Sequence, residues 1–299
     1  MLGLLLRYGS NNCIVQGFDS RFKSPGDEEF SLFQLGERVC DQILILPTTS
    51  KSLGLHLTVQ SFIDFLDSEG NIIVVLSPEY ELPSALHLLL SELGIYLPAD
   101  RESTVVDHFN YDLQSSPENH DTLLVSIANT TNAGFLGNMT GDQTIAVPKA
   151  VGQILDSSSP LILPVLQAPT TAYSYDKHEE IDIVEEPFGT GRQLSLVSAM
   201  QARNSARVVV VGSAYMIEDS WFDAKVEALG GSAKKNGNFE FIRRLFGWAY
   251  KEFGVLKSGG IEHHLEQEAE IQSSMNSARG AQKAELNVYR IKNRMVCLS

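Results

Sequence analysis

Short apolar runs alternate with amphipathic segments along most of this chain. The runs at 41–47 (DQILILP), 71–77 (NIIVVLS) and 206–213 (ARVVVVGS) are rich in β-branched residues, and 122–128 (TLLVSIA) has the same character. Runs of this kind, bounded by turn residues, are typical of strands that are covered on both faces. Because helix-like segments separate them, we predict an α/β fold built on a doubly wound, largely parallel sheet.

Three amphipathic segments are predicted to form helices. The first, at 57–70, has Thr58 as a capping residue and Gly70 where a left-handed exit is needed. The second, at 81–94, ends at Gly94 in the same way. The third, at 237–254, has an apolar side formed by Phe239, Ile242, Leu245, Phe246, Ala249 and Phe253.

The composition changes at two places and suggests the domain organisation. Residues 129–190 are rich in Thr, Ser, Pro and Gly, and we predict a β-rich insertion there within one α/β domain spanning 1–258. Residues 259–285 have no apolar stripe and are expected to form a polar linker or an exposed helix. The run LNVYRI then predicts that 286–299 begins a truncated β-rich domain.

The charge balance excludes some classes of partner. The chain has 37 acidic and 23 basic residues, a net charge of −14, which disfavours binding to nucleic acid or to an anionic membrane surface. The cysteines, Cys13, Cys40 and Cys297, are far apart, so small buried side chains are expected instead of a disulfide framework or a zinc site. Metal-binding motifs such as HExxH are missing, and His263-His264 in a polar stretch is interpreted as a solvated pair. We predict no cofactor.

Ligands of open α/β sheets bind at the carboxyl ends of the strands, so these ends are the places to search for chemistry. Ser77 follows one predicted strand, but Pro78 and the lack of flanking glycines argue against a nucleophile elbow. Gly212-Ser213 follows another, without the further glycine or the lysine of a phosphate-binding loop. The favoured interpretation is a tight turn in which Ser213 bonds to backbone.

The stretch VVDHFNYD concentrates side chains that hydrolases and metal sites use: Asp107, His108, Asn110, Tyr111 and Asp112. Asp107 and His108 are sequence neighbours, so on an extended chain they point to opposite faces and cannot form the orienting pair of a catalytic triad. One interpretation is an active centre. The other is a structural loop in which the Asp and Asn side chains bond local backbone amides while the His and Tyr pack at a domain surface.

Several blocks in the same order resemble a known family. The blocks VVDHFNYD, MQARNSARVVVVGSAYMIEDSWF and GNFEFIRRLFGWAYKEFGVLKSGGIEHH, together with FSLFQLGERVCDQILILPTTSKSLG, are similar to the non-catalytic DDOST/WBP-type subunit of oligosaccharyltransferase. The similarity covers roughly Phe22 to Asn293, nearly the whole chain.

The resemblance implies a fold and a role. It implies an α/β domain of glutamine-amidotransferase-like type without the amidotransferase nucleophile, which supports the assembly and stability of the complex that transfers oligosaccharide from dolichyl diphosphate to Asn of Asn-x-Ser/Thr sequons. The expected partners are the other subunits, including a catalytic one with a WWDYG signature that this chain lacks. It further implies that Asp107, His108, Asn110, Tyr111, Asp112, Arg203, Asn204, Gly212 and Ser213 lie in structural or partner-facing loops. Arg203 is expected either to pair with an acidic residue of the Asp107–Asp112 loop or to be solvated.

The resemblance also implies residence in the endoplasmic reticulum membrane with a lumenal domain. Members of the family have a signal peptide and a membrane anchor, and neither is recognisable here, so we expect a truncated gene model or a soluble paralogue. Membrane association is expected of the full-length member. If the chain enters the secretory pathway, the sequons at Asn129 and Asn138 are candidate N-glycosylation sites.

Two alternatives of other classes stay open. One is a hydrolase-like or amidotransferase-like enzyme in which His108 acts with Ser77 or Ser213. The other is a binding module of related fold that serves another assembly, such as ciliary transport.

Overall fold

A seven-stranded sheet forms the centre of the molecule in the computed structural model, which describes residues 19–24, 30–100, 102–127, 139, 143–176, 186–252 and 294–298. Across the sheet, the strands are β1 (Asp19–Lys23), β17 (Arg294–Leu298), β4 (Gln42–Ile45), β5 (Asn71–Val75), β14 (Arg207–Val211), β13 (Ser195–Gln201) and β11 (Ile162–Gln167). The sheet is mixed. Neighbouring strands from β1 to β14 are parallel, whereas β13 is antiparallel to both β14 and β11.

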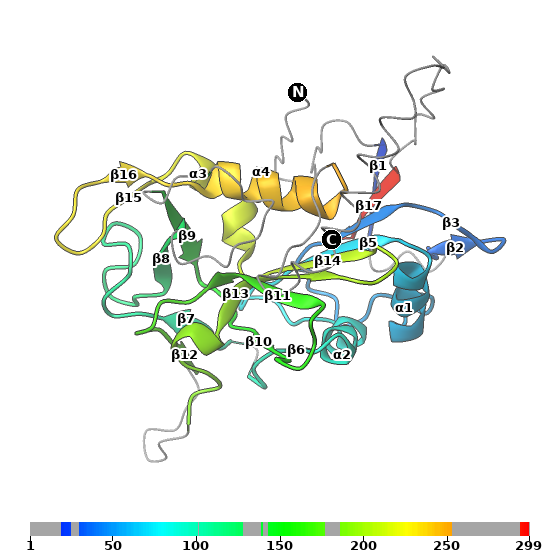
Figure 1. Cartoon of the computed structure of the whole chain (residues 1–299), viewed down its shortest axis with the longest axis horizontal. Coiled ribbons are helices and arrows are strands. Elements are labelled where there is room, and N and C mark those ends of the chain that lie inside the picture. Colours follow the sequence, from blue (N-terminus) through cyan, green and yellow to red (C-terminus); the bar gives the residue numbers. More distant parts are fainter. Residues whose placement is uncertain are drawn as a thin grey trace, which may run out of the picture.

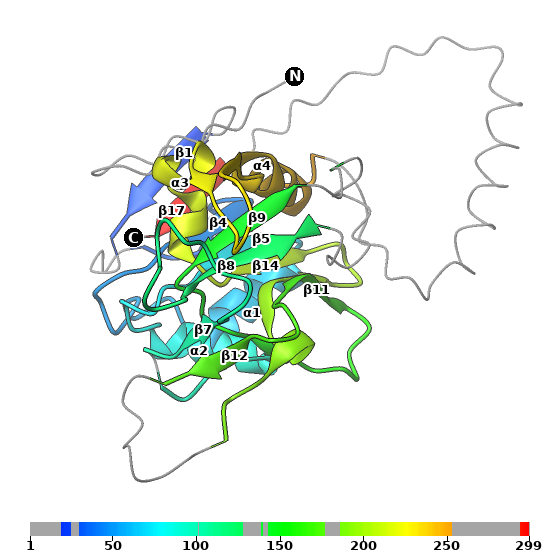
Figure 2. The same cartoon turned by 90° about the vertical axis from the view of Figure 1, so that its left-hand side faces the viewer.

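Helices pack on both faces of this sheet. The helices are α1 (Val59–Asp67), α2 (Ser84–Glu92), α3 (Asp219–Phe222) and α4 (Asn238–Ala249). Helices α1 and α2 lie on one face and α4 on the other (Figure 1; Figure 2). The side chains alternate accordingly: Ile72 and Val74 of β5 join the core under α1 and α2, while Ile73 and Val75 join the core under α4. The further likeness to an amidotransferase-type fold stays a prediction.

The ends of α1 and α2 follow from local chemistry. Thr58 caps α1: its hydroxyl accepts a hydrogen bond from Ser61 N, and Ser61 Oγ accepts one from Thr58 N. Gly94 adopts the left-handed conformation after α2, as predicted, with φ of 77°. After α1, however, the left-handed residue is Glu69 and not Gly70. Gly70 is required for another reason, because a Cβ there would lie 2.2 Å from the Phe65 ring.

Several short two-stranded ribbons surround the main sheet. They pair β2 (Phe33–Gln34) with β3 (Glu37–Arg38), β6 (Ile95–Tyr96) with β10 (Ile154–Leu155), β7 (Thr104–Val106) with β12 (Tyr173–Tyr175), β8 (Thr122–Ser126) with β9 (Thr144–Pro148), and β15 (Lys225–Val226) with β16 (Lys234–Lys235). The run at 122–128 therefore forms a strand outside the main sheet. Conversely, β11 lies within the range predicted as an insertion, yet it is an edge strand of the main sheet.

Residues 286–299 were predicted to begin a truncated β-rich domain. The described part of this range, β17, is instead a strand of the main sheet. Its residues Met295, Val296, Cys297 and Leu298 are buried between β1 and β4 in the main sheet, because apolar residues suit a strand covered on both faces. Residues 286–293, with most of LNVYRI, lie outside the described residues, as does the predicted linker 259–285. The remaining domain boundaries stay predictions.

Most of the apolar side of α4 is buried as predicted. Ile242, Leu245 and Phe246 are almost fully buried, whereas Phe239 is 41% exposed and makes an edge-to-face contact with Phe222 of α3. Of the cysteines, Cys40 and Cys297 are buried, as predicted, and Cys13 lies outside the described residues.

Candidate functional site

Asp107 holds together the loop formed by residues 107–112. Its carboxylate accepts hydrogen bonds from the backbone N–H of Phe109 (2.8 Å) and of Asn110 (3.2 Å), and from the Asn110 side-chain amide (3.0 Å). Thr171 donates its hydroxyl to the same carboxylate at 2.8–2.9 Å. The side chain is fully buried. A buried carboxylate with this many donors is satisfied by structure and has no open position for a substrate.

Asp112 has a similar role at the other end of the loop. It accepts hydrogen bonds from Ser115 N (3.0 Å), Ser115 Oγ (2.6 Å) and Glu227 N (2.7 Å), the last of which lies next to β15. Tyr111 is buried and forms a β-bridge with Leu123 of β8. Both Asp side chains of DHFNYD thus bond local backbone amides, as the structural interpretation predicted. Asn110 differs from that prediction, because its side-chain amide donates to the side chains of Asp107 and Thr171.

His108 is exposed and contacts an imidazole and a phenol. Its Nδ1 lies 2.5 Å from Nδ1 of His120, and its Nε2 lies 3.0 Å from the Tyr173 hydroxyl. Both ring nitrogens thus face groups other than a serine. The triad geometry that the enzyme alternative requires, a serine at one nitrogen and a carboxylate at the other, is not formed by His108 among the described residues.

The two candidate serines are also engaged. Ser213 is fully buried and donates its hydroxyl to the Pro148 carbonyl oxygen, so the predicted bond to backbone is confirmed. The backbone packs so closely at Gly212 that only a glycine fits. A Cβ at this position would lie 2.5 Å from the Leu196 carbonyl oxygen and 2.7 Å from that of Val151. Ser77 is 7% exposed, and its Oγ accepts a hydrogen bond from Glu79 N at 3.3 Å.

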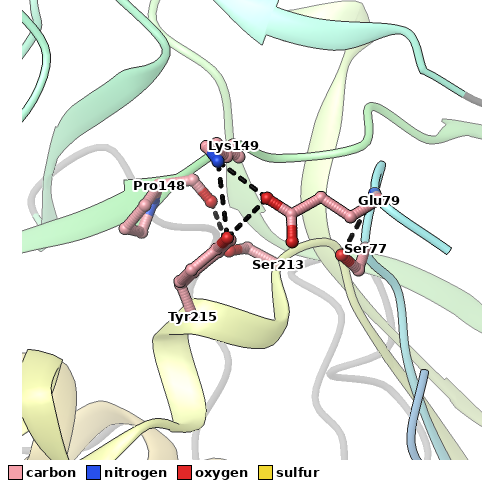
Figure 3. A network of polar contacts seen from close by, with 6 residues as sticks. All are labelled: Ser77, Glu79, Pro148, Lys149, Ser213 and Tyr215. Carbon is pink, nitrogen blue, oxygen red and sulfur yellow. Dashed lines mark hydrogen bonds and ion pairs between the residues drawn. The ribbon is translucent and has the colours of Figure 1, made fainter. Parts of the chain in front are cut away.

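A polar cluster that the sequence search missed lies beyond the carboxyl ends of β5 and β14. One carboxylate oxygen of Glu79 accepts hydrogen bonds from Lys149 Nζ (2.7 Å) and from the Tyr215 hydroxyl (2.6 Å), as Figure 3 shows. Lys149 Nζ also lies 3.4 Å from the Tyr215 hydroxyl and 5.2 Å from the centre of its ring. The cluster joins the segments after β5, β9 and β14.

The electrostatics of this cluster follow from Glu79. Its carboxylate is the main cause that raises the pKa of Lys149 above the usual value. The pKa of Tyr215 is also raised, first by burial and then by its hydrogen bond to Glu79. The side chains of Lys149 and Glu79 are 38% and 45% exposed, so solvent screening limits the stabilisation by this ion pair to at most about 1 kcal/mol. The cluster therefore positions loops more than it stabilises the fold.

A groove with a volume of about 570 Å³ lies beside this cluster, at the carboxyl ends of β4 and β5 and over the start of α2. Its walls are mainly apolar, with contributions from Leu46, Leu82, Pro83, Leu86, Leu97 and Pro98. Lys51 and Glu81, which form an ion pair of 3.3 Å, line the groove, and so does Ser77. It is the place where open α/β sheets commonly bind ligands.

Arg203 and Asn204 lie far from these loops, in the turn between β13 and β14 at the amino end of β14. Arg203 is exposed and forms no ion pair with Asp107 or Asp112, whose carboxylates bind other donors. Asn204 donates its side-chain amide to the Leu66 and Asp67 carbonyl oxygens, at 2.8 and 3.1 Å. It thereby satisfies carbonyl groups at the end of α1.

Some predicted features fall outside the described residues, namely Asn129, Asn138 and His263-His264. Within the described ranges, no group of three or more His, Cys, Asp or Glu side chains is arranged to hold a metal ion. No helix in the same ranges has the length and apolar character needed to cross a bilayer.

The fold and the site define a mixed α/β sheet domain whose polar loops at the carboxyl edge are bonded mainly to one another. A family model described as OST48, N-terminal domain, matches residues 14–252. The chain therefore belongs to the OST48 family.

Relatives with curated names agree with this assignment. The chain is 32% identical over 253 residues to the dolichyl-diphosphooligosaccharide–protein glycosyltransferase 48 kDa subunit of Danio rerio, covering 83% of this chain and 56% of the relative. The subunit of the same name from Drosophila melanogaster is 31% identical over 258 residues, covering 85% and 56%. The subunit wbp1 of Schizosaccharomyces pombe is 30% identical over 279 residues, covering 93% and 58%. The chain thus spans little more than half the length of these relatives.

A comparison with solved structures finds the mmIFT52 N-terminal domain, with a TM-score of 0.45 and 19% identity. The alignment covers 67% of this chain and 72% of that one.

Proposed function

We propose that this chain is a non-catalytic scaffold subunit of oligosaccharyltransferase, the complex that transfers oligosaccharide from dolichyl diphosphate to Asn residues of sequons. The observation that carries the proposal is the identity of 30–32% with three relatives named as subunits of that glycosyltransferase, over 83–93% of this chain. The partners are then the other subunits, including the catalytic one. The site of action is the lumenal side of the endoplasmic reticulum membrane.

The non-catalytic part of the proposal is supported by the bonding at the carboxyl edge. Ser213 is buried and donates to a backbone carbonyl, and His108 contacts His120 and Tyr173 instead of a serine. Asp107 and Asp112 each accept several hydrogen bonds from neighbouring loops. Such bonding fixes the shape of a surface, which is what a subunit that positions partners requires.

The test is purification of the endogenous protein from microsomes in a mild detergent, followed by detection of the catalytic subunit. Co-migration in one large complex is expected. A monomeric protein without that partner contradicts the proposal.

A matched pair of variants tests whether the Asp107–Asp112 loop faces a partner. Phe109 in this loop is 65% exposed, and Leu55, before α1, is 81% exposed. If the loop is partner-facing, Phe109→Ser reduces co-purification of the catalytic subunit because it removes apolar contact area, whereas Leu55→Ser does not. Equal recovery of the complex with both variants rules out a partner contact through Phe109.

A further inference from the structure

The groove at the carboxyl ends of β4 and β5 has walls that are poor in hydrogen-bond donors. Pro47, Pro83 and Pro98 line it, and a proline has no backbone N–H to offer to a ligand. Because proline also fixes φ, these stretches of the wall are rigid before anything binds. The volume of about 570 Å³ falls within the range of about 300–1,000 Å³ that small-molecule sites have. The groove is therefore a pre-formed, mainly apolar site of ligand size.

Ser77 presents one hydrogen-bond donor to this groove. The residue lines the groove although it is only 7% exposed, and its Oγ accepts a hydrogen bond from Glu79 N at 3.3 Å (Figure 3). Within the described part of the chain, no oxygen atom accepts the proton of this hydroxyl. A buried donor without an acceptor costs free energy, and an acceptor atom of a ligand in the groove would remove that cost.

Two large apolar side chains of the lining are open to water. Leu88 is 56% exposed and Tyr80 is 42% exposed. A single exposed leucine needs no explanation, but these two lie in the same groove as the Ser77 hydroxyl. An apolar ligand that covered them would gain free energy from the water that it displaces. The lining thus favours a ligand whose body is mainly apolar.

The charged side chains of the lining already have partners within the chain. Lys51 pairs with Glu81 at 3.3 Å, and the carboxylate of Asp100 accepts a hydrogen bond from Glu102 N at 3.3 Å. A charged ligand would lose its hydration against apolar walls without gaining a new counter-ion. An anion would in addition meet the net charge of −14 of the chain. An uncharged ligand fits this lining best.

We propose that the groove binds an uncharged, mainly apolar small molecule with an acceptor oxygen, such as that of a ketone or an ester, to which Ser77 donates its hydroxyl. The apolar body of the ligand lies against the proline and leucine side chains and covers Leu88 and Tyr80. The inference goes beyond the proposed function and stands whether or not the chain assembles with oligosaccharyltransferase.

The test is a fluorescence titration of the full chain with prodan, a neutral naphthalene with one ketone oxygen, whose emission moves to shorter wavelength in apolar surroundings. We expect saturable binding of one equivalent. Ala99 is exposed and lines the groove, so the side chain of Ala99→Trp occupies ligand space without entering the core and should weaken binding about tenfold or more. The matched control is Asn119→Trp, at an exposed position outside the lining, which should bind prodan as the unchanged chain does.

Two further comparisons test the chemistry of the ligand. Ser77→Ala should weaken the binding of prodan about fivefold, because one neutral hydrogen bond is lost. It should leave the binding of N-phenylnaphthylamine unchanged, since that probe has no carbonyl oxygen. Anilinonaphthalenesulfonate is the same molecule with an added sulfonate, and it should bind about tenfold more weakly than the neutral probe.

Absence of saturable binding, or binding that Ala99→Trp leaves intact, overturns the proposal. If Ala99→Trp does not fold, Ser84→Trp replaces it, because Ser84 is exposed at the start of α2 and also lines the groove. Equal weakening of both neutral probes by Ser77→Ala overturns the role of its hydroxyl as a donor, and tight binding of the sulfonate overturns the uncharged class. Prodan that binds the isolated chain but not the chain in a microsomal complex shows that a partner fills the groove, which also contradicts the proposal.

Discussion

Asn238 pairs with Ala146 through its side chain as a neighbouring strand would through its backbone. Its Nδ2 donates to the Ala146 carbonyl oxygen at 2.8 Å, and its Oδ1 accepts from Ala146 N at 2.9 Å. Both residues are fully buried. A single amide at the start of α4 thus satisfies the backbone of the middle residue of β9 and ties the helix to the β8–β9 ribbon.

Replacing the side-chain amide of Asn238 should lower the stability of the fold. Asn238→Ala leaves the buried N–H and C=O of Ala146 without partners, and each such group costs about 1–3 kcal/mol. We therefore expect the free energy of unfolding to fall by about 2–4 kcal/mol, measured by urea denaturation. The exposed Asn119→Ala is the control and should change stability by less than about 0.5 kcal/mol. A near-neutral Asn238→Ala would contradict the pairing.

Gly212 cannot tolerate a side chain. The Cβ of Gly212→Ala would lie 2.5 and 2.7 Å from two backbone carbonyl oxygens, which are unable to move without disturbing β13 and the segment after β9. Overpacking of this kind costs about 1–3 kcal/mol or more, so thermal unfolding should begin at a clearly lower temperature. Gly231→Ala, in the exposed turn between β15 and β16, meets its nearest atom only at 3.2 Å and should have a small effect.

The carboxylate of Asp107 should contribute to the free energy of unfolding mainly through its hydrogen bonds. Asp107→Ala removes all the hydrogen bonds that gather Phe109, Asn110 and Thr171, and the expected loss is about 3 kcal/mol because bonds to a charged group are strong. Asp107→Asn retains one acceptor oxygen and should lose less. The free energy of unfolding distinguishes the three chains, with Glu118→Ala as an exposed control nearby. If Asp107→Asn were less stable than Asp107→Ala, the acceptor role of this side chain would be wrong.

Glu240 predicts a pH dependence of stability. Arg243, and after it Arg244, lower the pKa of Glu240 through hydrogen bonds of 2.6–2.9 Å within α4. Because the folded pKa lies below the ordinary value of 4.5, the stabilisation is present above pH 4.5 and is lost as the pH falls through the folded pKa. These groups are partly exposed, so Glu240→Gln should cost only about 0.5–1 kcal/mol at neutral pH.

The measurement for Glu240 is the free energy of unfolding of both chains from neutral to acidic pH. The difference between them should shrink below pH 4.5 and approach zero. A difference that stays constant or grows on acidification would exclude the two ion pairs as its source.

The sequence predicted those elements well whose formation depends on a local run of one kind of residue. The β-branched runs became β4, β5 and β14 because buried parallel strands need such residues on both faces. The run at 122–128 formed a strand too, but its apolar pattern does not reveal which strand it pairs with, and it joined β9 outside the main sheet. The Thr58 cap was predictable because it bonds Ser61, only three residues away. The tight packing at Gly212 was not, because the carbonyl oxygens that it approaches belong to Leu196 and Val151, which are distant in the sequence.

The polar clusters were not predictable, for a physical reason. Glu79, Lys149 and Tyr215 come from three separate segments, and His108 meets Tyr173 on another strand. Such contacts depend on where the topology brings loops together, which hydrophobic periodicity does not encode. The bonds of Asp107 to Phe109 and Asn110, and of Asp112 to Ser115, were predictable because they span only two or three residues. The bond from Glu227 N to Asp112 was not, because Glu227 is distant in the sequence.

The position of β17 has a consequence for the order of folding. This strand separates β1 from β4, so in the described sheet β1 is attached only through β17, although the three strands come from opposite ends of the chain. During synthesis every other strand of the sheet emerges first, and the edge of β4 stays unpaired until residues 294–298 arrive. Unpaired edges of this kind invite association with other chains. We therefore expect the sheet to close only after residues 294–298 have been synthesised, and the edge of β4 to be open to association with other chains before then.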